Sequence, residues 1–183
     1  MIDNTVKKYL DPKIVVLFSA LGVNCEDFKK IFLVEENVPD DATGAYQKVV
    51  DIIYIRDVQT SISTPNTTSL HELIHWTGHR ERLERPNMYM GNTINHYATE
   101  EVTAQYGMHK LSKILGIDAD KSDQFLERYI RNYLPFADVD KAIHDADVAA
   151  NYVLEKLHSS GMPLDAFSKA ASSEKCSIAA SNI

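Results

Sequence analysis

Three histidines and a glutamate stand close together in the stretch TTSLHELIHWTGHRERL, residues 67–83. His71 and His75 are four residues apart, so on a helix they share one face and can both direct a ring nitrogen at a single metal ion. Glu72 is rotated by about 100° from His71 and can reach a water molecule beside that ion without being a ligand. The HExxH pattern therefore predicts a metal site with a carboxylate placed for general-base chemistry.

A catalytic zinc ion takes three protein ligands and keeps one position open, so a third ligand has to be found. The extended pattern HExxHxxGxxH is absent, because Glu81 stands six residues after His75. His79 is four residues after His75, but Gly78 should end the helix between them. We therefore interpret His79 as a structural or substrate-contacting residue in preference to a ligand.

The segment NHYATEEVTAQYG offers better candidates, Glu100 and Glu101, which lie 25 and 26 positions beyond His75. A loop followed by a returning antiparallel helix would bring one of them to the ion, giving two histidines and one glutamate as in gluzincins. Adjacent residues on a helix point about 100° apart, so only one glutamate can be a ligand. We favour Glu101, because Tyr97 and Gln105 flank it at four-residue spacing, and keep Glu100 as the alternative.

Helices with clear start and stop signals should carry these residues. Pro65 suits the first turn of the HExxH helix, either Thr64 or Asn66 can cap it, and Gly78 should end it. A second long helix is predicted over about 95–115. The two predicted helices would place the histidines and the glutamates on facing surfaces.

The remaining chain predicts one strand and further helices. The segment YQKVVDIIYIRDV is rich in β-branched and aromatic residues and predicts a strand over about 48–56, with a weaker one near 58–63. Residues 3–34 have the pattern of two helices. The segments ADKSDQFLERYIRNYL and DVDKAIHDADVAANYVLEKLHSSG predict two more helices, the last ending at Gly161.

Length and composition indicate a single globular domain. The chain has 183 residues, of which 44% are hydrophobic and 25% charged. We expect one domain over 1–160 and a disordered tail over 161–183, whose composition is small and polar. No apolar run approaches the roughly 18 residues of a membrane helix, and the N-terminus lacks the apolar core of a secretory signal. Cys25 and Cys176 are expected to be reduced thiols.

The motifs together resemble a known family. HELIHWTGH followed by YATEEVTAQYG is similar to the metallopeptidase domain of ArdC-type antirestriction proteins, found on plasmids and phages, where HELxHWTGH precedes a helix with a YAxEEL-like signature. DIIYI stands where the family has its strand before the helix, and the last two helical segments are similar to its C-terminal helices. The resemblance covers about 45–158.

The resemblance implies an α+β, mostly helical fold of zincin-like type, with a small sheet before the HExxH helix. It also implies His71, His75 and Glu101 as metal ligands and Glu72 as the catalytic carboxylate. We expect the ion to be zinc, with manganese as an alternative. The family commonly carries an N-terminal domain that binds single-stranded DNA, and the 45 or so residues ahead of the match are too few and too acidic for it.

Side chains around the ion are also predicted. The family favours a glutamate where this chain has Gln105, so this amide would orient a histidine without supplying charge. Tyr97, Tyr89 and His79 are candidates to contact the substrate or to stabilise the oxyanion. Trp76 is expected in the core.

Three functions are compatible with these residues. The leading hypothesis is a zinc-dependent metallopeptidase, encoded by a phage or plasmid, that acts on a host protein or peptide in the bacterial cytoplasm during antirestriction or host takeover. The alternative is a binding protein, stabilised by its metal but not proteolytic, that inhibits a host enzyme acting on nucleic acid. The net charge of −7 suits such a partner and argues against strong nucleic-acid binding by this chain.

Direct binding of single-stranded DNA is the third hypothesis. Arg128 and Arg131 would contact phosphates while Tyr129 and Tyr133 stack on bases. At helical spacing, however, Phe125, Tyr129 and Tyr133 are more typical of a core stripe.

Overall fold

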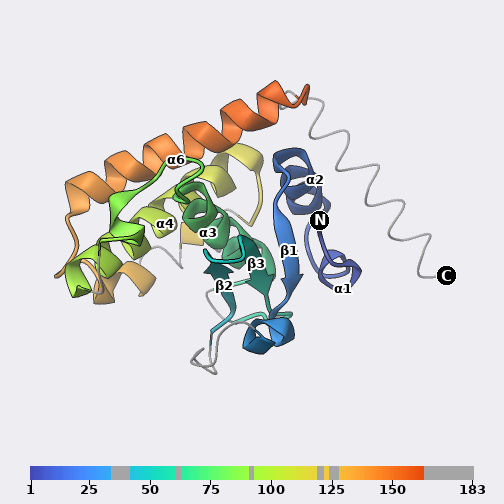
Figure 1. Cartoon of the computed structure of the whole chain (residues 1–183), viewed down its shortest axis with the longest axis horizontal. Coiled ribbons are helices and arrows are strands. Elements are labelled where there is room, and N and C mark those ends of the chain that lie inside the picture. Colours follow the sequence, from blue (N-terminus) through green and yellow to red (C-terminus); the bar gives the residue numbers. More distant parts are fainter. Residues whose placement is uncertain (34–41, 61–62, 91–92, 119–121, 124–127, 163–183) are drawn as a thin grey trace.

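The computed structural model describes residues 1–33, 42–60, 63–90, 93–118, 122–123 and 128–162. It consists mostly of helices with one small sheet (Figure 1), as predicted. The elements in chain order are α1 Asn4–Lys7, α2 Pro12–Leu21, β1 Asn24–Asp27, η1 Phe28–Leu33, β2 Gly44–Gln47, β3 Ile52–Ile55, α3 Pro65–Thr77, η2 Pro86–Met88, α4 Ile94–Leu115, η3 Ile130–Asn132 and α6 Val139–Ser159. The predicted tail over 161–183 lies outside the described residues, apart from 161 and 162.

The described sheet has three strands in the order β1-β3-β2. β1 pairs in parallel with β3, Cys25 lying opposite Ile53, and β2 pairs antiparallel with β3, Tyr46 lying opposite Ile53. The expectation of one strand over 48–56 is wrong in its extent: β3 begins at Ile52, and residues 48–51 form the turn that joins it to β2.

Two further expectations from the sequence are corrected. The second helix predicted within residues 3–34 is replaced by strand β1 and the 3₁₀ helix η1. Of the weak strand expected near 58–63, residues 58–60 and 63 form no strand, and 61–62 lie outside the described residues.

The helices that carry the candidate site begin and end where the sequence predicted. Thr64 caps α3 through a reciprocal capping box with Thr67, and Pro65 occupies the first turn. Gly78 is the C-cap of α3, and α4 ends at Gly116, whose φ of 62° is the left-handed conformation that glycine adopts readily.

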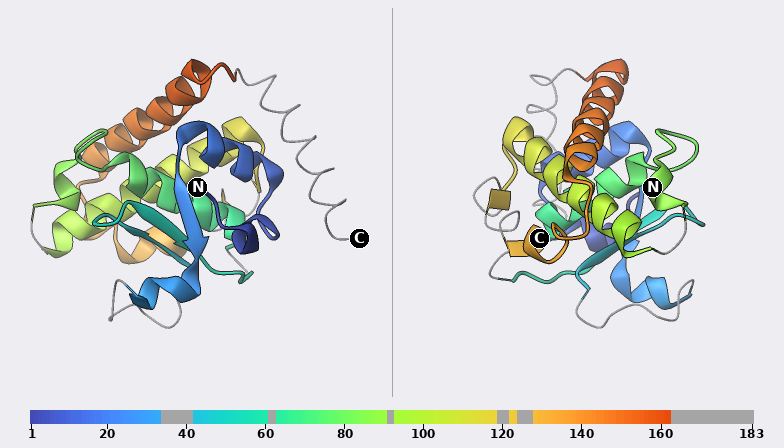
Figure 2. Two further views of the ribbon diagram at one scale, coloured as in Figure 1. Left: turned by 45° about the vertical axis from the view of Figure 1, so that its right-hand side comes forward. Right: turned by 90° about the vertical axis from the view of Figure 1, so that its left-hand side faces the viewer.

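The helices form layers over the sheet. α3 packs against β2 and β3, α4 packs against α3, and α6 packs on α4 (Figures 1 and 2). A Cβ added at Gly107 would lie 2.7 Å from Cδ1 of Ile74, so this glycine lets α4 approach α3 closely. The absence of a side chain at one position thereby sets the spacing between the two helices of the site.

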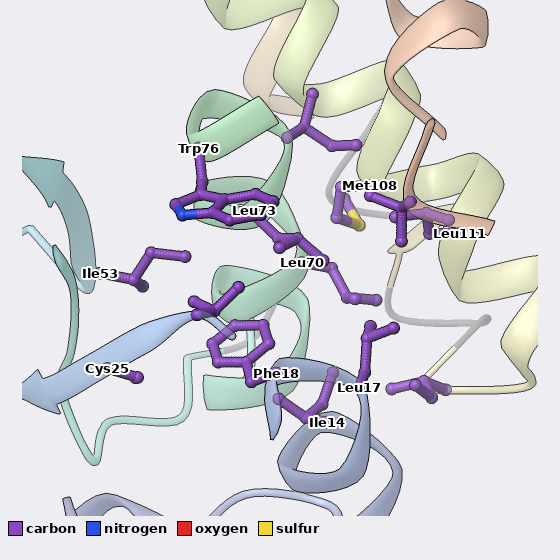
Figure 3. Close-up of a cluster of buried hydrophobic side chains, with 14 of the residues drawn as sticks. Ile14, Leu17, Phe18, Cys25, Ile53, Leu70, Leu73, Trp76, Met108 and Leu111 are labelled. Atoms are coloured by element: carbon purple, nitrogen blue, oxygen red, sulfur yellow. The ribbon is translucent and has the colours of Figure 1, made fainter. Parts of the chain in front are cut away.

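The main core lies between α2, α3, α4 and the sheet (Figure 3). Its buried side chains include Ile14, Leu17, Phe18, Ile53, Leu70, Leu73, Met108 and Leu111. Trp76 is 6% exposed and belongs to this core, which confirms its predicted place. Cys25 is a buried free thiol, as expected, whereas Cys176 lies outside the described residues.

The β2–β3 turn is tied to the loop that follows α3. The Arg82 guanidinium donates to both carboxylate oxygens of Asp51, at 2.5 and 3.1 Å, and to the hydroxyl of Tyr46 at 3.0 Å. Its Nε donates to the backbone oxygen of Trp76 at 2.6 Å. The arginine therefore joins the hairpin to the C-terminal end of α3.

No helix in the described part of the chain is long and apolar enough to cross a membrane.

Candidate metal centre

Two histidines of α3 and one glutamate of α4 converge on one point. Nε2 of His71 lies 3.2 Å from Nε2 of His75, and these nitrogens lie 3.5 and 3.7 Å from the carboxylate oxygens of Glu101. One potential ligand atom from each residue lies within 4.8 Å of the others. Because nitrogen and carboxylate oxygen are the donors that zinc takes from proteins, this group fits a zinc ion.

The other ring nitrogen of each histidine is held from behind. Nδ1 of His71 lies 3.0 Å from Oε1 of Gln105, and Nδ1 of His75 lies 3.1 Å from Oε1 of Glu100. Both partner oxygens can accept a hydrogen bond from Nδ1–H, which leaves Nε2 available as a metal ligand. Of the two adjacent glutamates, the structure thus brings Glu101 into the convergent group and places Glu100 behind a histidine.

The order of these contacts shows how the helices run. His71 meets Gln105, whereas His75, one turn later on α3, meets Glu100 and Glu101, earlier on α4. α4 therefore runs antiparallel to α3 beside the site, as the sequence predicted.

The carboxylates of Glu100 and Glu101 bring negative charge into the protein interior beside the histidines. Burial raises the pKa of Glu101, but the hydrogen bond with His71 and the charge of His75 outweigh this and set the pKa at about 2. Burial lowers the pKa of His75, but Glu100 and Glu101 outweigh this and raise the pKa to about 9. A proton or a metal cation can balance these carboxylates.

Glu72 lies next to the convergent residues but is not one of them. It is buried, and that burial raises the pKa of its carboxyl group above the usual range. The backbone amide of Tyr46 on β2 acts in the opposite direction and lowers this pKa, but burial outweighs it. A carboxylate with a raised pKa is a better proton acceptor, which suits a general base.

Tyr129 is a site residue whose contact the sequence did not reveal. Its hydroxyl donates to Oε2 of Glu101 at 2.8 Å, and its ring meets the ring of His71 edge-on at 5.6 Å. The stripe predicted over Phe125, Tyr129 and Tyr133 is half-buried at the two tyrosines, while Phe125 lies outside the described residues. Helical spacing cannot tell a packed tyrosine from one that also binds a ligand carboxylate.

A row of tyrosine rings leads from Glu101 towards the surface. The ring centroids of Tyr129 and Tyr133 are 5.2 Å apart, and those of Tyr133 and Tyr97 are 5.7 Å apart. Tyr97 is 51% exposed, and partial burial and the Glu101 carboxylate raise the pKa of its hydroxyl. Tyr97 therefore stays protonated and can donate a hydrogen bond beside the site.

The other two candidates lie in the loop after α3 and outside the convergent group. Nδ1 of His79 accepts from the backbone nitrogen of Glu81 at 3.2 Å. The Tyr89 hydroxyl accepts from the backbone nitrogen of Arg80 at 2.9 Å. Both side chains therefore organise this loop.

Comparisons with known proteins identify the family and the fold. A family model described as zincin-like metallopeptidase (MPTase-PolyVal) matches residues 34–149. The structure is similar to the metal-free crystal structure of the antirestriction ArdC protein from plasmid R388, with 25% sequence identity and a TM-score of 0.53 over 81% of this chain and 52% of that one. For the Mn(II)-bound structure of the same protein, the values are 26%, 0.52, 80% and 52%.

The chain thus spans about half the length of the ArdC chains that it matches. A search of the curated proteins gave no significant match. The resemblance drawn from HELIHWTGH and YATEEVTAQYG is confirmed, and the family match covers the sheet hairpin, α3, α4 and half of α6. This chain belongs to the zincin-like metallopeptidase family.

Proposed function

We propose that this protein is a metal-dependent peptidase of gluzincin type. The observation that carries the proposal is the buried convergence of His71, His75 and Glu101, with Glu72 beside it and free of a ligand role. The family and the donor set support zinc as the ion. Manganese is the alternative, because the similar ArdC protein was solved with Mn(II) bound.

Each residue of the site has a separate role in the proposed peptide hydrolysis. A bound zinc ion would act as a Lewis acid that polarises the scissile carbonyl. Glu72 takes a proton from the attacking water and passes it to the leaving amine. Tyr97, protonated and half-exposed beside Glu101, is placed to donate to the developing oxyanion.

The substrate enters as an extended peptide in this proposal. β2 forms one edge of the described sheet and packs against α3, and the backbone amide of its residue Tyr46 lowers the pKa of Glu72. An edge strand offers unpaired backbone groups to an added peptide strand. A peptide paired with β2 would therefore pass close to the general base.

The decisive experiment is Glu72→Gln. The variant should keep its metal and its fold, because Glu72 is outside the ligand group, while turnover of a peptide library by the zinc-loaded protein should fall by about 10²–10⁴-fold. Glu81→Gln, an exposed change in the following loop, is the matched control and should leave turnover unchanged. Undiminished turnover by Glu72→Gln would refute the mechanism.

The biological setting follows from the ArdC likeness as a further part of the proposal. We place the protein in the cytoplasm of a bacterial host, encoded by a phage or plasmid and acting on a host protein in antirestriction or host takeover. A non-proteolytic inhibitor of a host enzyme is the second candidate, favoured by the net charge of −7. Full biological effect from Glu72→Gln would select the inhibitor.

A further inference from the structure

A buried arginine lies behind the metal site and donates four hydrogen bonds to three groups. Arg85 is 4% exposed, and its Nε and Nη2 donate to the two carboxylate oxygens of Glu100 at 3.1 and 2.5 Å. Its Nη1 donates to Oγ1 of Thr77 at 2.7 Å, and Nη2 also donates to the backbone oxygen of Ile74 at 2.7 Å. The guanidinium is therefore anchored to the last turn of α3 and grips Glu100 on α4 with two parallel bonds.

The glycine of the WTGH sequence makes room for this arginine. A Cβ at Gly78 would lie 2.7 and 2.8 Å from Nη2 and Cζ of Arg85, and 2.3 Å from Sδ of Met88. Those distances are too short for a side chain, so Arg85 can lie against α3 only where a glycine stands. Thr77 and Gly78 of the motif thus both serve the placement of Arg85.

Glu100 connects the anchored Arg85 to His75, a proposed metal ligand. Its Oε1 accepts a hydrogen bond from Nη2 of Arg85 and also lies 3.1 Å from Nδ1 of His75. An imidazole held at Nδ1 by a fixed acceptor has its tautomer and its ring plane set, so that Nε2 faces the ion.

We propose that Arg85 and Glu100 are a positioning pair for His75: Arg85 fixes the Glu100 carboxylate, and that carboxylate holds the imidazole with Nε2 directed at the metal. The proposal rests on the proposed function only in taking His75 as a ligand. It gives the two adjacent glutamates separate tasks, Glu101 in the ligand group and Glu100 behind it.

If the Arg85–Glu100 ion pair had a purely structural role, its replacement would have a different outcome. An ion pair that only fastens α3 to α4 could be exchanged for apolar side chains of similar size, which often costs a folded protein little. A positioning pair could not, because the exchange removes the acceptor that faces His75. The presence or absence of that acceptor is therefore the variable to test.

Two double variants differ in that one property. Arg85→Met/Glu100→Gln removes the buried charges but leaves an amide oxygen opposite Nδ1 of His75, whereas Arg85→Met/Glu100→Met removes the acceptor as well. Zinc affinity is measured by competition with a chromophoric chelator, the Co(II) visible spectrum reports the ligand geometry, and circular dichroism confirms folding. We expect the glutamine variant to stay within about threefold of wild type and the methionine variant to bind about 10–100-fold more weakly, with an altered Co(II) spectrum.

Equal affinities in the two folded variants would overturn the positioning role. A second measurement needs no variant: histidine-labelled, zinc-loaded wild-type protein should show a hydrogen-bonded Nδ1 proton on His75 by NMR, and its absence would equally overturn the proposal. These readouts are independent of turnover. A protein that binds zinc through a positioned His75 but cleaves nothing would refute the peptidase and leave this inference standing.

Discussion

Glu100 and Glu101 are identical side chains on successive residues, and the helix turns them towards different surroundings. Glu101 faces Nε2 of both histidines, whereas Glu100 faces Nδ1 of His75 and the guanidinium of Arg85. Helix geometry allowed the sequence to predict that only one of them could join the histidines. Arg85 could not be predicted, because it comes from an irregular loop whose path no sequence pattern sets.

The ligand assignment predicts the outcome of removing one carboxylate. Glu101→Ala should release the ion, since a three-ligand site loses most of its affinity with one ligand. Metal content by mass spectrometry and the zinc-induced rise in Tm should both fall sharply. Glu155→Ala, an exposed glutamate on α6, is the control and should match wild type. Full zinc occupancy in Glu101→Ala would assign the third ligand elsewhere.

At the level of elements, caps predicted more than propensity did. α3 lies where Pro65, its cap residues and Gly78 placed it, and α4 and α6 end close to the predicted positions. β1 was missed because its four residues, Asn24–Asp27, are mostly polar, and it is a strand through pairing with β3. Val49 has strand propensity yet is 84% exposed in the turn, so tertiary structure overrides the local preference.

The close approach of α3 and α4 makes Gly107 sensitive to change. Gly107→Ala should destabilise the fold by about 1–3 kcal/mol, because the new methyl group overlaps Ile74. It should also weaken zinc binding by moving Glu101 away from the histidines. A double-mutant cycle with Ile74→Ala, followed by urea unfolding, should show a coupling of about 1 kcal/mol or more. Strict additivity would mean that the helices are not limited by this contact.

The hairpin turn predicts a dependence of stability on pH. Partial burial raises the pKa of Asp51, but hydrogen bonds from Arg82 and Tyr46 outweigh it and lower the pKa below its usual range. The lowered folded-state pKa means that Asp51 stabilises the fold above the unfolded value of about 3.9, and that this contribution is lost as the pH falls through the folded value.

Asp51→Asn tests this directly, because asparagine tolerates the φ of 55° at this position. With the Asp51 side chain 35% exposed, solvent screening limits the loss to about 1 kcal/mol at pH 7. The difference between variant and wild type, measured by urea unfolding of metal-free protein, should shrink below about pH 4. A constant difference from pH 7 to pH 3 would show that the charge of Asp51 contributes nothing.

For the whole molecule, charge argues against nucleic acid as a strong ligand. The net charge is −7, and Tyr129 and Tyr133 are half-buried against Glu101 and each other. We expect affinity for single-stranded DNA no tighter than about 10⁻⁵ M at physiological salt, the range of non-specific binding. Fluorescence anisotropy should show any residual binding lost in Arg128→Ala/Arg131→Ala and at higher salt. Sub-micromolar binding at 200 mM salt would restore the third hypothesis.

Both ends of the described chain share one core, and this has a consequence for synthesis. α2 packs against α3 and α6, and Lys13 at its start donates to the backbone oxygens of Leu115 and Gly116 at the end of α4. A ribosome makes α2 early and α6 late, so Phe18 and its neighbours have no complete cover until residues 139–159 have emerged. The helices that carry the proposed metal ligands lie between these ends, and their packing is also complete only when α6 is in place.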